Sequence, residues 1–186
     1  MTRWTENRFR RADLAHGADH VLVPTATFRD NAGSSFTARL ATETALHGFL
    51  DLVVRYPVKT STVTMFLEPR GYKPSPSAPP EFLPSSLYFD VDQASGTAAV
   101  ALLLIDATGT SHQWLTQGDL GRDDLVLVMD PENPDYATFP PESFISVAVL
   151  REAVTQWAFG DELPPAATSW RMANEDEVGW PVGAGY

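Results

Sequence analysis

The chain has 186 residues, of which 44% are hydrophobic and five are tryptophan, enough apolar material for one domain with a buried core. It contains no cysteine, which excludes disulfides, thiol nucleophiles, iron–sulfur clusters and thiolate zinc sites. The 13 Lys and Arg against 24 Asp and Glu give a net charge of −11, a sign that repels phosphate backbones and disfavours direct binding to nucleic acid.

The charge is unevenly distributed along the chain. Residues 1–73 hold ten Lys and Arg against seven Asp and Glu, a net charge of +3. Residues 74–186 hold three basic and 17 acidic residues, a net charge of −14. Such an excess of acidic residues serves solubility in many proteins, and it also suits a face complementary to a basic partner. Both interpretations are open at this point.

The sequence shows no membrane or export signal. It lacks an apolar run of eighteen or more residues, and its opening, MTRWTENRFRRADL, is basic and polar with no apolar stretch behind it. We therefore expect a cytoplasmic protein that does not bind a membrane.

The first third of the chain predicts two strands and one helix. DHVLVP at Asp19–Pro24 has the composition of a strand and ends at a proline, and STVTMFLEP at Ser61–Pro69 alternates like a strand. Between them a helix is expected from Thr42, a capping residue, to the break at Pro57. Its apolar stripe consists of Leu46, Phe49, Leu50 and Val53.

The segment KPSPSAPPEFLP at 73–84 has five prolines in twelve residues, too many for a helix or a central strand. We interpret it as an extended loop inside one domain. A linker between two domains is the alternative, but residues 1–73 would then supply only one helix and about two strands, too few for a core of their own.

A run of strands follows the proline-rich loop. SSLYFDVD, GTAAVALLLIDA and TSHQWLTQ are separated by the short turns DQASG and DATG, which predicts an antiparallel meander. DLVLVMD at Asp124–Asp130 reads as a fourth apolar strand.

A second helix is expected after the stretch FPPES, with Ser146 or Ser143 as its cap. AATSWRM at Ala166–Met172 reads as a closing strand. The tail at 174–186 has no periodicity, and whether it docks is open. The apolar stripe of the helix consists of Val147, Leu150, Val154 and Trp157.

This order of elements predicts an α+β fold: an antiparallel β-sheet, in part a meander, with about two helices packed on it. We expect a single domain over residues 1–186, with an irregular N-terminus.

The sequence offers few groups that could converge for catalysis. None of the four histidines has a recognised metal-ligand spacing, and the chain has no GxSxG or Walker motif. Asp90 and Asp92 form a DxD pair, but Ala94 stands where an EF-hand would need the next oxygen ligand. We expect no catalytic residue, no metal and no cofactor, although a triad assembled from distant residues stays open.

Seven acidic residues lie within 24 positions that contain one basic residue, Arg122, and they form a candidate docking edge. Four aromatic residues are candidates either for anchoring a partner or for the core: Tyr136, Phe139, Trp114 and Trp157. The core is the commoner place for each of them, and above all for Trp157, which lies on the apolar stripe of the second helix. The predicted partner-binding residues are Asp119, Asp123, Asp124, Asp130, Glu132, Asp135, Tyr136 and Glu142.

Short features in a fixed order carry a family resemblance. They are the strand LYFDVD, the strand GTAAVAL, a strand with a tryptophan near its middle (Trp114), Gly118–Asp119, an apolar strand, FPPESFI at Phe139–Ile145, the helix VLREAVTQW and a late Trp170. In this order the chain resembles a family of bacterial immunity proteins that are encoded beside polymorphic toxins and often accompany toxins of the nucleic-acid deaminase class. The resemblance covers about residues 42–172 and is closest from Phe139 to Trp170.

The chain departs from that family at Ser146, where a proline is usual, in the longer loop at 160–167 and in the proline-rich insert at 73–84. The resemblance implies an α+β protein that is not an enzyme and that neutralises a cognate toxin by protein–protein contact. A toxin that acts on nucleic acid needs a basic groove, which an acidic domain can occupy.

Two alternatives stand beside this interpretation. One is a small-ligand-binding α+β domain or an enzyme that uses His112, Asp119 or the Asp90/Asp92 pair in a pocket on the sheet. The other is a structural or regulatory interaction domain without a toxin, which the sequence does not distinguish from an immunity protein.

Overall fold

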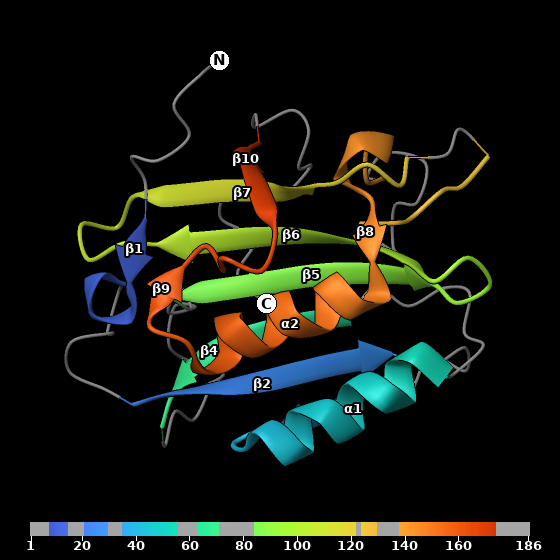
Figure 1. Cartoon of the computed structure of the whole chain (residues 1–186). Coiled ribbons are helices and arrows are strands. Elements are labelled where there is room, and N and C mark those ends of the chain that lie inside the picture. Colours follow the sequence, from blue (N-terminus) through green and yellow to red (C-terminus); the bar gives the residue numbers. More distant parts are fainter. Residues whose placement is uncertain are drawn as a thin grey trace.

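The computed structural model describes residues 8–14, 21–29, 35–55, 63–70, 84–121, 124–129 and 138–173. Their main feature is a large antiparallel β-sheet, and both of the α-helices in this part of the chain pack on the same face of it (Figure 1). The predicted α+β class is confirmed.

The large sheet has eight strands. The described residues contain ten strands in all: β1 Phe9–Arg10, β2 Leu22–Arg29, β3 Ser35–Arg39, β4 Val63–Pro69, β5 Ser85–Asp92, β6 Thr97–Ile105, β7 Ser111–Gln117, β8 Ile145–Ser146, β9 Glu162–Leu163 and β10 Ser169–Met172. Seven of them follow the order β10-β7-β6-β5-β4-β2-β3, and β8 pairs with β6 beside this path. β1 and β9 form a separate two-stranded sheet.

The predicted meander is present as β5, β6 and β7, which are neighbours both in the chain and in the sheet. Acidic side chains close both of its turns. Asp92 accepts a hydrogen bond of 2.8 Å from the Ser95 amide, and Asp106 accepts amide hydrogen bonds in the second turn. Gly96 and Gly109 take φ values of 68° and 84°, a region that favours glycine.

The strand β2 runs through Pro24, where the sequence predicted its end. It pairs with β4 on both sides of this proline, whereas its pairing with β3 begins only at Thr25↔Arg39. The Pro24 carbonyl accepts the Leu40 amide (2.8 Å) on the β3 side. In an antiparallel strand the N–H and C=O of one residue point to the same side, so the N–H that Pro24 lacks would also face that side, beyond the end of β3. The proline therefore costs no ladder hydrogen bond.

The first helix, α1, spans Glu43–Arg55. As predicted, it begins after Thr42, whose hydroxyl accepts a hydrogen bond of 3.2 Å from the Ala45 amide. The predicted stripe faces the core: Leu46 and Leu50 are fully buried, and Phe49 and Val53 are partly buried against them.

The second helix, α2, spans Val147–Phe159. Of the two predicted caps, Ser146 is the one used, because its hydroxyl accepts the Val149 amide at 3.2 Å. The Ser143 hydroxyl donates instead to the Pro140 carbonyl. The stripe is confirmed: Leu150, Val154 and Trp157 are fully buried, and Val147 packs against them.

Arg11 ties the N-terminal part of the chain to the end of α2. Its guanidinium donates to the carbonyls of Gly160 (2.5 Å) and Trp157, two acceptors left free by the end of the helix. Burial lowers the pKa of this arginine, while the nearby Asp161 carboxylate acts in the opposite direction. The contact explains how β1 and β9 come to lie together.

The prediction of a fourth apolar strand at Asp124–Asp130 is wrong for the residues that are described, 124–129. They make a single isolated bridge, Val128↔Thr138, and no ladder. Leu127 and Met129 are buried, so the segment crosses the sheet face and packs on it. Its apolar alternation serves that packing instead of strand pairing.

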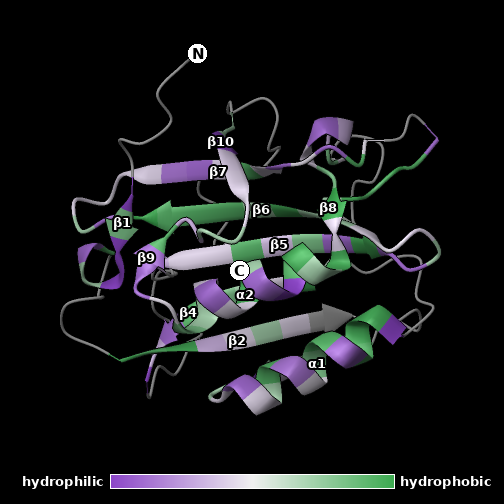
Figure 2. Ribbon diagram, in the orientation of Figure 1, coloured by the Kyte–Doolittle hydropathy of each residue, from purple (hydrophilic) through white to green (hydrophobic). Residues whose placement is uncertain are grey.

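The sheet separates two hydrophobic cores. One lies on the side of the sheet that α1 and α2 cover, which we call the helix face, and the other lies on the opposite side, which we call the far face. The strand β6 contributes to both, because successive side chains point to opposite faces. Val100, Leu102 and Leu104 pack under the helices, while Ala99 and Ala101 face the other side. Figure 2 shows this strand as continuously apolar, as expected for a strand buried on both faces.

The predicted closing strand is present in shorter form as β10, which pairs with β7. Residues 73–83 of the proline-rich loop, the tail at 174–186 and the N-terminal residues 1–7 lie outside the described part of the chain. The single domain over residues 1–186 stays a prediction.

Candidate functional site

Three short segments lie together on the far face, and we call them the far-face cover: residues 118–121, 124–129 and 138–144. The Phe139 amide donates to the Leu127 carbonyl at 2.9 Å, and the Gly118 amide donates to the Glu142 carbonyl at 2.8 Å. These hydrogen bonds join the third segment to each of the other two. The cover is thus a single layer of mostly irregular chain, with one short 3-10 helix at Pro141–Ser143.

Gly118 allows the closest approach in this layer. A Cβ atom at this position would lie 1.9 Å from the Phe144 carbonyl oxygen, so no other residue fits without a shift of the backbone. The Leu120 amide donates to the same Phe144 carbonyl at 3.3 Å. The segment after β7 is therefore held by backbone contacts.

The underside of the far-face cover is apolar. Four of its side chains are at most 2% exposed, and they pack on small and aliphatic side chains of β6 and β7. This burial fixes the layer on the sheet. The residues in this core are Leu127, Met129, Phe139 and Phe144 from the cover, with Ala99, Ala101 and Leu115 from the sheet.

A buried polar chain also fastens the cover. The Thr116 hydroxyl of β7 donates to the Ser143 carbonyl at 2.7 Å, and the Ser143 hydroxyl donates to the Pro140 carbonyl at 2.6 Å. Thr116 and Ser143 are fully buried, so each contact satisfies a group that would otherwise be costly to bury.

The outer surface of the cover combines acidic and apolar side chains. Asp119, Asp124 and Glu142 are exposed, and the apolar side chains of Leu120 and Val126 are 40% and 67% exposed. The Glu142 carboxylate lies 3.5 Å from the guanidinium of Arg171 on β10, which links the cover to the edge of the sheet.

Three of the eight predicted partner-binding residues can thus be placed, and all three belong to this cover: Asp119, Asp124 and Glu142. Gly118, next to Asp119, is bonded to Glu142 itself, so these two acidic residues lie close in the fold although 23 positions separate them in the sequence. The others lie outside the described residues: Asp123, Asp130, Glu132, Asp135 and Tyr136.

The other candidate aromatic anchors belong to the core. Trp114 and Phe139 are 4% and 2% exposed, and Trp157 is fully buried, where its indole N–H donates to the Ser85 hydroxyl at 2.9 Å. In this part of the chain the exposed apolar groups of the cover are aliphatic, not aromatic.

The groups considered for a pocket on the sheet do not converge. His112 alternates with Trp114 and lies on the helix face of β7, whereas Asp90 lies on the far face of β5. Asp119 follows the end of β7 and is exposed. The sheet separates the histidine from the acidic groups, so they do not form one site.

His112 has a different set of neighbours. Its Nε2 lies 3.0 Å from the Asp106 carboxylate, and its ring centroid is 4.6 Å from Phe9 and 5.8 Å from Trp114. Hydrogen bonds from the Thr108 side chain, then from His112 and from the backbone, lower the pKa of Asp106. These contacts stabilise the β6–β7 turn and hold the N-terminal segment against β7.

Asp90 is a half-buried carboxylate beneath the far-face cover. One of its oxygens accepts the Val128 amide of the cover and the other accepts the Val91 amide of its own strand, both at 2.8 Å. Burial raises the pKa of Asp90 although both hydrogen bonds act to lower it, and the Asp92 charge adds to the rise.

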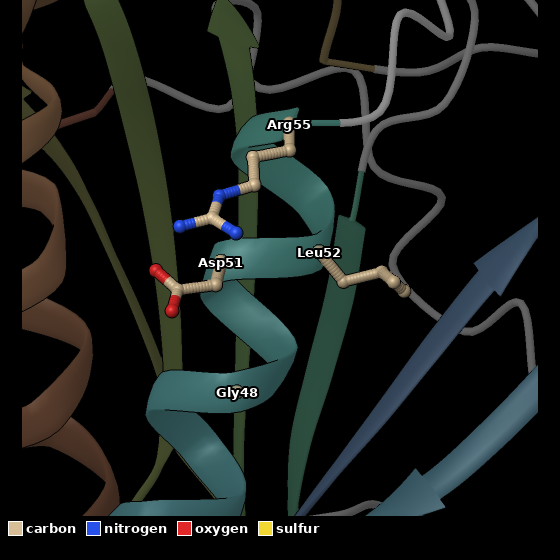
Figure 3. Close-up of a pocket in the computed structure, with 4 residues that line it drawn as sticks. All are labelled: Gly48, Asp51, Leu52 and Arg55. Carbon is tan, nitrogen blue, oxygen red and sulfur yellow. The ribbon is translucent and has the colours of Figure 1, made fainter.

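An open hollow of about 240 Å³ lies elsewhere, along α1, lined by Gly48, Asp51, Leu52 and Arg55 (Figure 3). Asp51 also forms an ion pair of 2.7 Å with Arg151 of α2. None of the groups considered for chemistry lines this hollow.

Sequence reasoning missed the two exposed apolar residues of the cover, Leu120 and Val126, and the roles of Gly118 and Asp90. Val126 stands in an apolar run that predicts burial, and only the tertiary structure shows which members of the run face outward. Gly118 stands directly before Asp119, one of the predicted partner-binding residues. A glycine at that place is a weak sequence signal for a close approach of two backbone segments.

Within the described residues, no three His, Asp or Glu side chains gather as potential metal ligands. None of the helices in that part of the chain has the length and apolar character required to cross a membrane.

Comparisons with known proteins give little more. No family model matches the chain, and no curated protein matches it. A crystal structure of a hypothetical protein from Neisseria gonorrhoeae is similar at a TM-score of 0.43 and 7% sequence identity, covering 76% of this chain and 90% of that chain. This likeness is too distant to bear on function.

Proposed function

We propose that this chain is an immunity protein, which binds a cognate bacterial toxin by protein–protein contact and neutralises it in the cytoplasm of the producing cell. The toxin would act on nucleic acid and belong to the deaminase class. In this proposal the chain carries out no chemistry, and the metal and the general acid/base belong to the toxin.

The observation that carries the proposal is the outer surface of the far-face cover. It presents three acidic side chains, Asp119, Asp124 and Glu142, together with the exposed apolar side chains of Leu120 and Val126. Protein interfaces combine apolar contact with charges that set register and speed encounter. The layer is fastened by buried groups, so it offers this surface with little ordering cost on binding.

Charge supports the same choice of partner. Residues 74–186, which include the whole cover, have a net charge of −14. A toxin that acts on DNA or RNA needs a basic groove for the phosphate backbone, and an acidic protein can compete for that groove. The ordered features that resemble the immunity family add independent support.

The direct test is co-expression with the neighbouring toxin gene. We expect cells that carry both genes to survive and the two proteins to migrate as one complex in gel filtration. A toxin that still kills, with no complex formed, would contradict the proposal.

The position of the interface can be tested by charge reversal. Asp119→Lys combined with Asp124→Lys should lower the association rate constant by about tenfold at low salt and reduce its dependence on ionic strength. The matched control is Glu152→Lys, which reverses an exposed charge on α2, on the helix side of the sheet. Equal effects of the two changes would place the interface elsewhere.

A further inference from the structure

The far-face cover is anchored at its middle segment by one ionisable group. Most of its fastenings are apolar contacts or backbone hydrogen bonds, but the Val128 amide donates to the Asp90 carboxylate at 2.8 Å. Asp90 belongs to β5, 38 positions earlier in the chain, so this contact bridges the sheet and the cover directly.

The geometry gives both carboxylate oxygens of Asp90 a donor. Oδ2 accepts the Val128 amide, and Oδ1 accepts the Val91 amide near the end of β5, beyond the last β4–β5 pair at Val63↔Phe89. A charged acceptor makes both hydrogen bonds stronger than neutral ones would be. Asp90 therefore holds together two backbone segments that share no ladder.

The two amide donors offset part of the cost of placing a charge at this buried position. Burial raises the pKa of Asp90, so the charge is held there at a cost. The same position on the far face has small neighbours, since Asp90 pairs with the buried Ala99 of β6. A side chain without acceptor oxygens would leave the Val128 amide without this partner beneath the cover.

We propose that the Asp90 carboxylate is a positioning group, which fixes segment 124–129 in the conformation that turns Leu127 and Met129 inward and presents Asp124 and Val126 to a protein partner. Val126 lies two residues before the anchored amide, between the buried Leu127 and the half-buried Leu125. Release of Val128 would allow this alternation to slip, which would change the side chains that face outward. The positioning role of Asp90 stands on these contacts alone, and only the binding of a partner rests on the proposed function.

The first test measures amide hydrogen exchange without any partner. In Asp90→Asn, which keeps the shape of the side chain and removes the charge, the Val128 amide and its neighbours at 125–129 should exchange about tenfold faster or more. Amides of β5 and β6 should keep their exchange rates, because a local opening does not require global unfolding. Asp90→Glu, which restores the charge, should recover part of the protection.

The matched control is Asp92→Asn, two positions along the same strand and on the same face, whose carboxylate bonds to Ser95 in the turn. It should leave the exchange of 125–129 unchanged. Equal loss of protection in both variants, or a uniform rise across β5 and β6, would mean a structural role only and would overturn the proposal. In the unmodified protein, a Val128 amide that exchanges as fast as an unstructured chain would overturn it without any variant.

The second test separates this inference from the proposed function. With the co-expressed toxin as probe, Asp90→Asn should raise the dissociation rate of the complex by about tenfold, since the cover must be reordered on binding. If no toxin binds even the unmodified protein, the proposed function fails, while the exchange result still decides the role of Asp90. If the toxin binds both forms equally although 125–129 has opened, the cover is not the interface and the positioning role for binding is overturned.

Discussion

The two faces of the sheet are covered in different ways. On the helix face, α1 and α2 bury continuous apolar stripes on β4, β5 and β6. On the far face, mostly irregular chain is held by a close glycine contact, buried hydroxyls and the carboxylates of Asp90 and Glu142. Regular packing suits stability, because each residue adds to one large core, whereas an irregular cover can expose selected side chains at its outer surface. In the function that we propose, the helix face maintains the fold and the far face meets the partner.

The largest expected effect lies on the helix face. Leu150→Ala removes a fully buried side chain from α2 and leaves a cavity against the sheet. We expect a loss of about 2–5 kcal/mol in the free energy of unfolding, measured by urea denaturation. Binding to the toxin should persist under conditions in which the variant is folded. A loss below about 1 kcal/mol would mean that the stripe does not carry the core.

The next effect tests how tightly the far-face cover is seated. In Gly118→Ala the new Cβ would meet the Phe144 carbonyl at 1.9 Å, so the segment after β7 must shift. We expect a destabilisation of about 1–3 kcal/mol together with weaker toxin binding. The matched control is Gly48→Ala in α1, where a Cβ meets nothing within 4 Å.

That control should stabilise the protein by up to about 1 kcal/mol, because alanine favours the helix. If both glycine variants behaved alike, the close approach at Gly118 would not be a constraint, and the contrast between the two faces would weaken.

The same contrast sets what sequence reasoning could reach. The helix face was predictable because the stripes of both helices repeat with the helical period, and each begins with a side chain that can cap it. Thr42 and Ser146 indeed cap α1 and α2. The meander was predictable for a similar reason, since its turns carry Asp and Gly next to strands with β composition.

The far face resisted prediction because its contacts are not local. The alternation of Leu125, Leu127 and Met129 is the same for a strand in a ladder and for a segment lying flat on a sheet. The contact that decides between the two comes from a residue distant in sequence, because the Val128 amide donates to Asp90, 38 positions earlier in the chain. The end of β2 is a similar case. A proline predicts the end of a strand, and only the tertiary structure shows that the pairing with β3 begins after Pro24, at Thr25↔Arg39.

A smaller effect on stability, but a clear one on binding, is expected at Val126. Its side chain is 67% exposed, so Val126→Ser should change the free energy of unfolding by no more than about 0.5 kcal/mol. If the cover is the interface, toxin affinity should fall, because an apolar contact with the partner is lost. Leu52→Ser is the matched control, since Leu52 is 53% exposed on α1. Equal affinities of the two variants would remove Val126 from the interface.

The smallest effect concerns two carboxylates whose titration should affect stability with opposite signs. The pKa of Asp106 is lowered from 3.8 by the Thr108 hydroxyl first and then by His112 and backbone amides. Its contribution to stability is therefore present above pH 3.8 and is lost as the pH falls below that value. The pKa of Asp90 is raised by burial, so the stability that Asp90 contributes is largest below pH 3.8 and falls as the pH rises through the folded-state pKa, although the hydrogen bonds from Val128 and Val91 to the carboxylate offset part of this loss.

Melting temperatures measured against pH test this opposition. The deficit of Asp106→Asn relative to the unmodified protein should be largest near neutral pH and should close in acid. For Asp90→Asn the trend reverses: its melting temperature relative to the unmodified protein should improve as the pH rises, because the variant does not bury a charge. If the melting temperatures of the two variants changed with pH in parallel, the turn at Asp106 and the site beneath the cover would present similar environments to a carboxylate. The electrostatic part of the contrast between the two regions would then be removed.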